Sequence, residues 1–156
     1  MKYVGRLWKN PQGGNTVVAI HNDGLERILP SCTKIMNHSP NGFSWGYSGS
    51  GPAQLALAIL CDFFSQLPGS TIEELKCKAG QGGEEEPPTL ERLSWPDWLA
   101  IRSHQAFKAA LIAKLPPDDG FTITDEQIAE ILGIRIEPPE DFSEPKPKPK
   151  PKPKPD

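Results

Sequence analysis

The feature that most constrains the fold of this chain is a run of mainly apolar residues from Pro52 to Gln66. Pro52 favours the first turn of a helix, because its missing N–H would have been unsatisfied there, and Pro68 ends the run. Five residues gather on one side of this helix at about 100° per residue: Gln54, Ala58, Cys61, Asp62 and Ser65. The rest of the circumference faces protein, so the sequence predicts a central helix buried in the core.

Three short runs before this helix are typical of β-strands: Lys2–Trp8, Thr16–His21 and Leu25–Leu29. Turn residues separate them. The Asp23-Gly24 step favours a hairpin, because type I′ turns need positive φ at both central residues. A three-stranded sheet with one apolar face is stable only when another element covers that face. We expect the buried helix to cover it.

Two further helices are predicted in the second half of the chain. One runs from Ser94 to Leu115 and begins with a capping box, Ser94-Trp95-Pro96-Asp97. The other follows Thr124, with Gln127 as its box partner and Gly133 as its C-terminal cap. The predicted fold class is therefore α+β: a small antiparallel sheet of three to four strands packed on one buried helix, with two further helices beside it.

One α+β domain is predicted over residues 1–136, with Ile134–Ile136 as the candidate for a fourth strand. Within the domain, residues 69–93 lack periodicity and are rich in Gly, Pro and Glu, so we expect a flexible acidic insertion there. Residues 137–156 are predicted to be a disordered tail. Its five Lys-Pro repeats favour an extended polyproline II rod without internal hydrogen bonds.

The charge distribution disfavours binding to duplex nucleic acid. The formal net charge is −3, and residues 73–145 carry sixteen acidic groups against seven basic ones. No segment predicted to fold has the basic surface that duplex-binding proteins need to neutralise phosphates.

Cysteine usage is typical of a reduced compartment. The chain has three cysteines, Cys32, Cys61 and Cys77, with no C-x-x-C pairing, which argues against a disulfide framework and a zinc site. The start of the chain lacks the apolar core of a signal peptide, and the longest apolar run, Ala53–Phe64, is too short to span a bilayer. We expect a cytoplasmic protein with no membrane partner, no metal and no cofactor.

The segment Gly46–Pro52 is the strongest candidate for a binding site. A glycine-rich loop that opens a helix presents unpaired N–H groups and the positive end of the helix dipole, which suit a phosphate. Trp45 and Tyr47 could stack on a base or a sugar. The residues that could meet the phosphate are Ser48, Gly49, Ser50 and Gly51. The alternative is that the glycines only permit a tight turn, because the loop matches neither G-x-G-x-x-G nor G-K-[ST].

The histidines and cysteines give weaker signals. His104 lies at the edge of the apolar stripe of the second helix, where it is either a packed core residue or a polar contact in a pocket with Lys108 one turn further on. His38 could reach the same region if its loop folds back. Cys61 is expected to be inert packing within an apolar run. No constellation of these residues has the geometry expected of an active site, so an enzyme is the less favoured class.

One long motif resembles a known family. The stretch from His38 to Leu60, with the form HSPxGFxWGYxGSGPAQLALAIL, is similar to the signature of domain of unknown function 6166, a family of small proteins from bacteria, archaea and phages. His104-Gln105-x-Phe107-Lys108 and Thr124-x-x-x-Ile128 also fit, although tyrosine is expected in place of His104. The resemblance covers about residues 2–133. It implies a shared fold and a shared surface that includes the glycine-rich loop, Gln54, His104 and Lys108, but no reaction.

Two main hypotheses follow. The first is a non-enzymatic, homo-oligomeric protein that captures a phosphorylated, nucleotide-like small molecule, with charge from Arg6 or Lys108. In a phage setting it would act as a sponge for a host defence signal. The second is a protein–protein interaction module that uses the Trp-rich second helix and the proline tail. A hydrolase that uses His104 is a third, less favoured class.

Overall fold

The computed structural model describes residues 1–7, 15–40, 42–81 and 94–136. Four strands form one antiparallel sheet: β1 (Lys2–Arg6), β2 (Thr16–Ile20), β3 (Glu26–Ile28) and β4 (Phe121–Thr124). Their order across the sheet is β3-β2-β1-β4, so β1 and β2 are the central strands. The fold is α+β, which confirms the predicted class and the three N-terminal strands.

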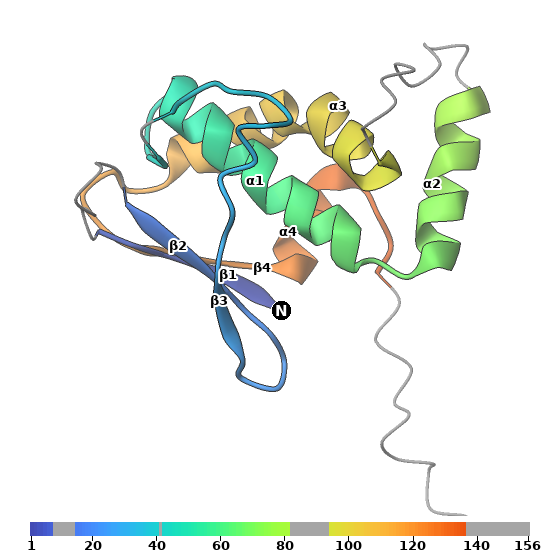
Figure 1. Ribbon diagram of the computed structural model, residues 1–156, viewed down its shortest axis with the longest axis horizontal. Helices are drawn as coiled ribbons and strands as arrows, with labels where there is room; N and C mark the ends of the chain where they lie inside the picture. Colours follow the sequence, from blue (N-terminus) through green and yellow to red (C-terminus); the bar gives the residue numbers. More distant parts are fainter. Residues whose placement is uncertain (8–14, 41, 82–93, 137–156) are drawn as a thin grey trace, which may run out of the picture.

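Four α-helices accompany the sheet: α1 (Ser50–Gln66), α2 (Gly69–Gln81), α3 (Trp95–Ala110) and α4 (Asp125–Leu132). A single 3-10 turn, η1 (Ile112–Lys114), follows α3. Figure 1 shows α1 running between the sheet and α3, while α2 bends away from the end of α1. The order of layers is therefore sheet, α1 and α3, with α1 at the centre as its apolar sequence predicts.

Helix α1 is buried on every side. All of its residues from Gly51 to Phe64 are buried, including the polar Gln54 and Asp62. The side that holds these polar residues is therefore covered as well, and only its last member, Ser65, is exposed. The side chains of Gln54 and Asp62 accordingly need partners inside the protein.

A row of residues across the inner face of the sheet explains how Asp62 is accommodated. Arg27, Ala19, Tyr3 and Ile123 are paired across the four strands in that order. The small side chain of Ala19 leaves room for its larger neighbours, and both Tyr3 and Arg27 reach the carboxylate of Asp62 in α1. Side chains alternate between the two faces of a strand, so Arg6 lies on the opposite, outer face from Tyr3.

The fourth strand is β4, not the predicted Ile134–Ile136. Phe121 and Ile123 alternate with exposed or half-buried threonines, and β4 pairs with β1. Ile134 instead takes part in the hydrogen bonding that ends α4. Its backbone N–H donates to the carbonyl of Ala129 at 2.9 Å, beyond a left-handed Gly133. The capping box at Thr124 and Gln127 forms as predicted.

The prediction of a flexible insertion at 69–93 is wrong for the first half of this segment, which forms α2. Ile72 and Leu75 lie one turn apart and pack against the core, and Lys76 pairs with Glu73 at 2.8 Å. These local pairs outweigh the polar composition that favours a loop. Residues 82–93 and the predicted tail at 137–156 lie outside the described residues.

The predicted second helix is shorter than its sequence pattern. It begins with Ser94 as N-cap, as expected, but ends at Ala110, and the separate turn η1 covers Ile112–Lys114. Among the described residues, no single helix is long and apolar enough to cross a membrane. Helices α1 and α2 (as far as Lys76) pass that test only together, with a bend of 115° between them.

Candidate functional site

The glycine-rich loop is a tight turn against the end of α3. Gly46 has a φ of +87°, and its N–H donates to the carbonyl of Ile112 at 3.0 Å. A Cβ atom at this position would lie 2.6 Å from the carbonyl oxygen of Leu115 and from Pro117. Gly46 therefore has a structural role, as the alternative interpretation of the loop proposes.

Tyr47 folds over the start of α1. A Cβ atom on Gly49 would lie 2.5 Å from the Tyr47 ring, and the Tyr47 hydroxyl lies 2.8 Å from Oγ of Ser44. Gly51 is buried beneath the side chain of Ser44. Tyr47 is nevertheless 52% exposed, so part of this residue is accessible to a ligand.

The start of α1 has no side-chain cap. Its N-cap residue is Gly49, and the backbone of Ser50 and Gly51 forms the first helical positions. Amide groups at these positions have no acceptor within a helix. Ser48 and Ser50 are exposed, so the start of the helix reaches the surface at these two residues, although Gly51 is buried.

Trp45 lies in the core. It is 2% exposed, its indole Nε1 donates to the carbonyl of Asp119 at 2.9 Å, and its ring packs edge-on against Phe121 at 4.8 Å. The structure thus places Trp45 away from solvent and leaves Tyr47 as the aromatic ring exposed beside the loop.

Gln54, one turn into α1, fixes the loop that precedes the glycine-rich segment. Its Oε1 accepts from the backbone N–H groups of His38 (2.7 Å) and Ser39 (3.2 Å), and its Nε2 donates to the carbonyl of Ser31 at 2.5 Å. Gln54 is fully buried and satisfied by these bonds. Its amide therefore positions the loop over α1 and is already occupied by the protein.

His38 and His104 lie in direct contact, as the sequence suggests if the His38 loop folds back. Their Nε2 atoms are 2.9 Å apart, and Nδ1 of His104 lies 2.6 Å from the carbonyl oxygen of Ile101. His104 is 3% exposed, and burial lowers its pKa, as do the nearby His38 and Lys108 to a smaller extent. The structure thus brings together His38, Gln54 and His104, with Lys108 close to them.

Arg6 does not join this group. It lies on the outer face of the sheet, exposed, with Glu26 at 3.5 Å. The side chain of Lys108 is half-buried near His104, at the end of α3 that meets the glycine-rich loop. Of the two basic residues predicted to supply charge, Lys108 is the one on the same side of the sheet as α1.

A second polar group surrounds Asp62. Oδ2 of Asp62 accepts from the hydroxyl of Tyr3 at 2.7 Å, and Oδ1 accepts from the guanidinium of Arg27. Burial, together with the Asp62 carboxylate, raises the pKa of Tyr3 far above its ordinary value. Arg27 also donates from Nε to Nε2 of His21 at 2.9 Å, so the group extends to the surface.

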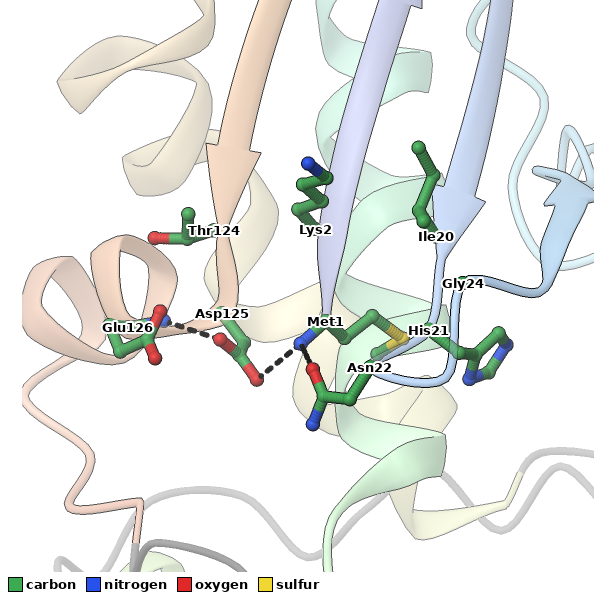
Figure 2. Close-up of a pocket in the computed structure, with 9 residues that line it drawn as sticks. All are labelled: Met1, Lys2, Ile20, His21, Asn22, Gly24, Thr124, Asp125 and Glu126. Atoms are coloured by element: carbon green, nitrogen blue, oxygen red, sulfur yellow. Dashed lines mark hydrogen bonds and ion pairs between the residues drawn. The ribbon is translucent and has the colours of Figure 1, made fainter.

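His21 borders a surface pocket that the sequence did not predict. The pocket has a volume of about 420 Å³ and lies between the turn after β2 and the start of α4. Figure 2 shows Asn22 and Asp125 pointing toward the N-terminal amino group of Met1, which lies 2.6 Å from Asn22 Oδ1 and 3.2 Å from Asp125 Oδ2. Two sequence motifs form part of its wall: the Asn22-Asp23-Gly24 turn and the capping box that begins at Thr124. Each motif is explained by the local structure that it forms, a hairpin turn and a helix cap, so neither one predicts a pocket.

Cys32 and Cys61 are adjacent but free thiols. They are hydrogen-bonded to each other, which lowers the pKa of Cys32 and, with burial, raises that of Cys61 far above its ordinary value. Cys61 packs within the hydrophobic core, and its lack of reactivity stays a prediction. In the described part of the chain, no three His, Cys, Asp or Glu side chains form a cluster that could hold a metal ion.

The fold and the loop define a small α+β domain in which a glycine-rich segment opens a buried central helix. The family model described as "Family of unknown function (DUF6166)" matches residues 3–76, and this match supports the resemblance to that family over the first half of the chain. The match includes β1 to β3, the glycine-rich loop and α1. The resemblances at 104–108 and 124–128 lie outside it and stay predictions. Comparisons with curated proteins and with solved structures found no match.

Proposed function

We propose that this protein is a non-enzymatic binding protein that captures a phosphorylated, nucleotide-like small molecule at the start of α1. The observation that carries the proposal is the uncapped start of this helix, which reaches the surface at Ser48 and Ser50. A helix of 17 residues places a partial positive charge there, and an anion stabilises it.

The surroundings of the helix start suit a nucleotide better than a bare anion. The exposed side chain of Tyr47 is a candidate stacking surface close to the exposed Ser48 and Ser50. Lys108, in the last turn of α3, is a basic residue on the same side of the sheet as α1. Trp45 and Arg6 have no part in the proposed site, because one is buried in the core and the other lies on the outer face.

Thermal denaturation with a panel of nucleotides tests the proposal. The panel contains adenosine and guanosine mono- and triphosphates together with cyclic mono- and dinucleotides. A ligand present at about 100 times its Kd stabilises the folded state by about 2.7 kcal/mol, which gives a clear rise in Tm. An unchanged Tm across the panel, with no small molecule retained in native mass spectrometry, would contradict the proposal.

The same native spectrum tests two further parts of the proposal. It counts subunits, and more than one is expected for a homo-oligomer. In a phage setting, a protein that holds a signal nucleotide without turning it over would act as a sponge for host defence signalling. Recovery of the captured nucleotide intact after prolonged incubation supports this role, whereas its hydrolysis would favour an enzyme.

A pair of aromatic rings favours the second candidate, a protein–protein interaction module. Trp95 and Trp98 of α3 pack edge to face at 5.2 Å, and both are half-buried. Lys76 lies 5.2 Å from the Trp95 ring and Arg102 lies 5.5 Å from the Trp98 ring, which makes a cationic aromatic surface of the kind found at interfaces. Deletion of residues 145–156 separates the two functions, because an adaptor that works through the tail loses its partner and a small-molecule binder keeps its ligand.

A further inference from the structure

We propose that Cys32 and Cys61 form a thiol oxidation site, at which a hydroperoxide converts their two side chains into a reversible disulfide bond. The two thiols are free in the structure and hydrogen-bonded to each other. Their spacing in the sequence matches no C-x-x-C motif, so only the fold brings them together. The inference is independent of the proposed nucleotide site, because it rests on this pair of sulfur atoms and on how the protein holds them.

The loop that carries Cys32 is fixed against α1. The carbonyl of Ser31, the preceding residue, accepts a hydrogen bond of 2.5 Å from the buried side chain of Gln54. The carbonyl of Cys32 itself accepts from the backbone N–H of Ile35 at 3.0 Å, which closes a turn. The Cys32 side chain packs against the hydrophobic core to which Cys61 belongs. The two sulfur atoms are therefore held side by side without a covalent bond between them.

The backbone of Cys32 has an unusual conformation. Its φ is +56°, and among the residues that the structure describes no other residue except glycine has a positive φ. Residues with side chains adopt this conformation only where their surroundings hold them there, and residues held in this way are concentrated at functional sites. A glycine would adopt the same conformation without strain. The presence of a cysteine at this position therefore points to a use for its thiol.

The two thiols differ in exposure, and this difference sets the order of the reaction. Cys32 is partly exposed, whereas Cys61 is 5% exposed within α1. The hydrogen bond with Cys61 lowers the pKa of Cys32, although burial and the carboxylates of Asp97 and Asp62 act in the opposite direction. A thiolate within reach of solvent is the form that peroxides oxidise. Cys32 therefore reacts first, and the buried Cys61 reacts only with oxidised Cys32.

The disulfide forms in two steps. The Cys32 thiolate first attacks one oxygen of the hydroperoxide, so that an S–O bond forms and the O–O bond breaks. Cys32 becomes a sulfenic acid, and the other oxygen leaves with a proton from solvent as water or an alcohol. The Cys61 sulfur then attacks the Cys32 sulfur, so that an S–S bond forms and the hydroxyl group leaves as water with the proton of the Cys61 thiol. The two thiols lose two electrons in total, and the hydroperoxide takes them up.

The disulfide changes how the loop at 31–39 is attached to α1. In the reduced protein, the hydrogen bonds of Gln54 and the contact between the two thiols hold this loop. In the oxidised protein, a covalent bond replaces the thiol contact. A cross-link between residues far apart in the sequence restricts the unfolded chain, so the oxidised protein should have the higher Tm. A dithiol such as dithiothreitol restores both thiols by disulfide exchange.

Peptide mapping of the full-length protein after treatment with hydrogen peroxide tests the site. The protein is reduced and then oxidised, and its remaining free thiols are alkylated before digestion and mass spectrometry. The expected result is a pair of peptides joined through Cys32 and Cys61, which dithiothreitol separates. The matched control is Cys77→Ser, which removes the third cysteine of the sequence and should form the same bond as the wild type. Its Tm should rise on oxidation.

Two further variants test the order of the steps. Cys61→Ala lacks the second thiol, so a sulfenic acid should accumulate at Cys32, where dimedone traps it. Cys32→Ser keeps only the buried thiol of the pair, which peroxide and dimedone should leave unlabelled. Absence of the Cys32–Cys61 bond from the oxidised wild type overturns the proposal, and this result requires no variant to fold. Equal oxidation of Cys61 in Cys32→Ser and in the wild type also overturns it, because Cys61 then reacts without Cys32.

Discussion

The hydroxyl of Tyr3 in β1 donates a hydrogen bond of 2.7 Å to Oδ2 of Asp62, a carboxylate buried within the apolar helix α1. The guanidinium of Arg27 in β3 pairs with the other oxygen of the same carboxylate. One side chain of the central helix therefore connects two strands of the sheet. The register that places Tyr3, Ala19 and Arg27 in one row makes this possible.

Asp62→Asn is expected to destabilise the protein by about 2 to 3 kcal/mol, because it leaves the partly buried Arg27 guanidinium without its counter-charge. The measurement is the free energy of unfolding by urea at neutral pH. Glu130→Gln removes the same charge from an exposed position of α4 and should change stability by less than about 0.5 kcal/mol. Equal effects of the two variants would contradict the role assigned to Asp62.

The raised pKa of Tyr3 predicts a loss of stability at alkaline pH. The folded protein keeps the phenol protonated, whereas the unfolded chain ionises it near its ordinary pKa of about 10. The contribution of the protonated phenol to the free energy of unfolding is complete below about pH 10. It is lost as pH rises further, at up to about 1.4 kcal/mol per pH unit. Tyr3→Phe should lack this slope, and an identical slope in both proteins would count against the prediction.

Two glycines with the same φ angle have different surroundings, and we therefore expect their substitution by alanine to cost different amounts of stability. Gly24 and Gly46 both have a φ of +87°, but a Cβ atom meets nothing within 4 Å at Gly24 and clashes with backbone and Pro117 at Gly46. Gly24→Ala should cost about 1 kcal/mol, the conformational penalty alone. Gly46→Ala should cost about 2 kcal/mol more, because the loop must move. Urea unfolding of both variants measures the difference, and equal costs would contradict the packing of this loop on η1.

The lowered pKa of His104 predicts a loss of stability in mild acid. The folded state favours the neutral ring, so its contribution is complete above the unfolded pKa of about 6.5 and is lost as pH falls below it. Urea unfolding at pH 7.5 and pH 5.5 measures the loss. His104→Gln should reduce this pH dependence more than His21→Gln does. The reverse order would show that another group controls the acid response.

Local patterns account for most of the fold. Alternating residues and an Asp-Gly turn identify β1 to β3, and an apolar run with Pro52 identifies α1. The strand β4 has only four residues, and its pairing with β1 spans the whole domain, so no local pattern distinguishes it from the segment at 134–136. The first turns of α2 were not predicted, because the segment is polar and has few apolar residues besides Ile72 and Leu75 to reveal a helical period.

The candidate site was predictable only in part. A glycine-rich helix start is visible in the sequence, but the fate of each side chain beside it depends on tertiary packing. Trp45 and Tyr47 are two residues apart, yet one is buried against Phe121 and the other is exposed. The contacts of Gln54 with the 31–39 loop and the pairing of His38 with His104 are long-range, so periodicity cannot indicate them.

The most direct test of the central claim is nucleotide binding by Ser50→Glu and Ser50→Gln. Ser50 is the exposed first residue of α1, where a carboxylate stabilises the helix dipole and repels a phosphate, while glutamine matches its size without the charge. With the nucleotide that raises the wild-type Tm most, Ser50→Glu should keep the Tm of the free protein and weaken binding at least about tenfold, or 1.4 kcal/mol. Ser50→Gln should bind within about threefold of the wild type. Equal affinity of both variants for the nucleotide would show that the ligand is not held at the start of α1.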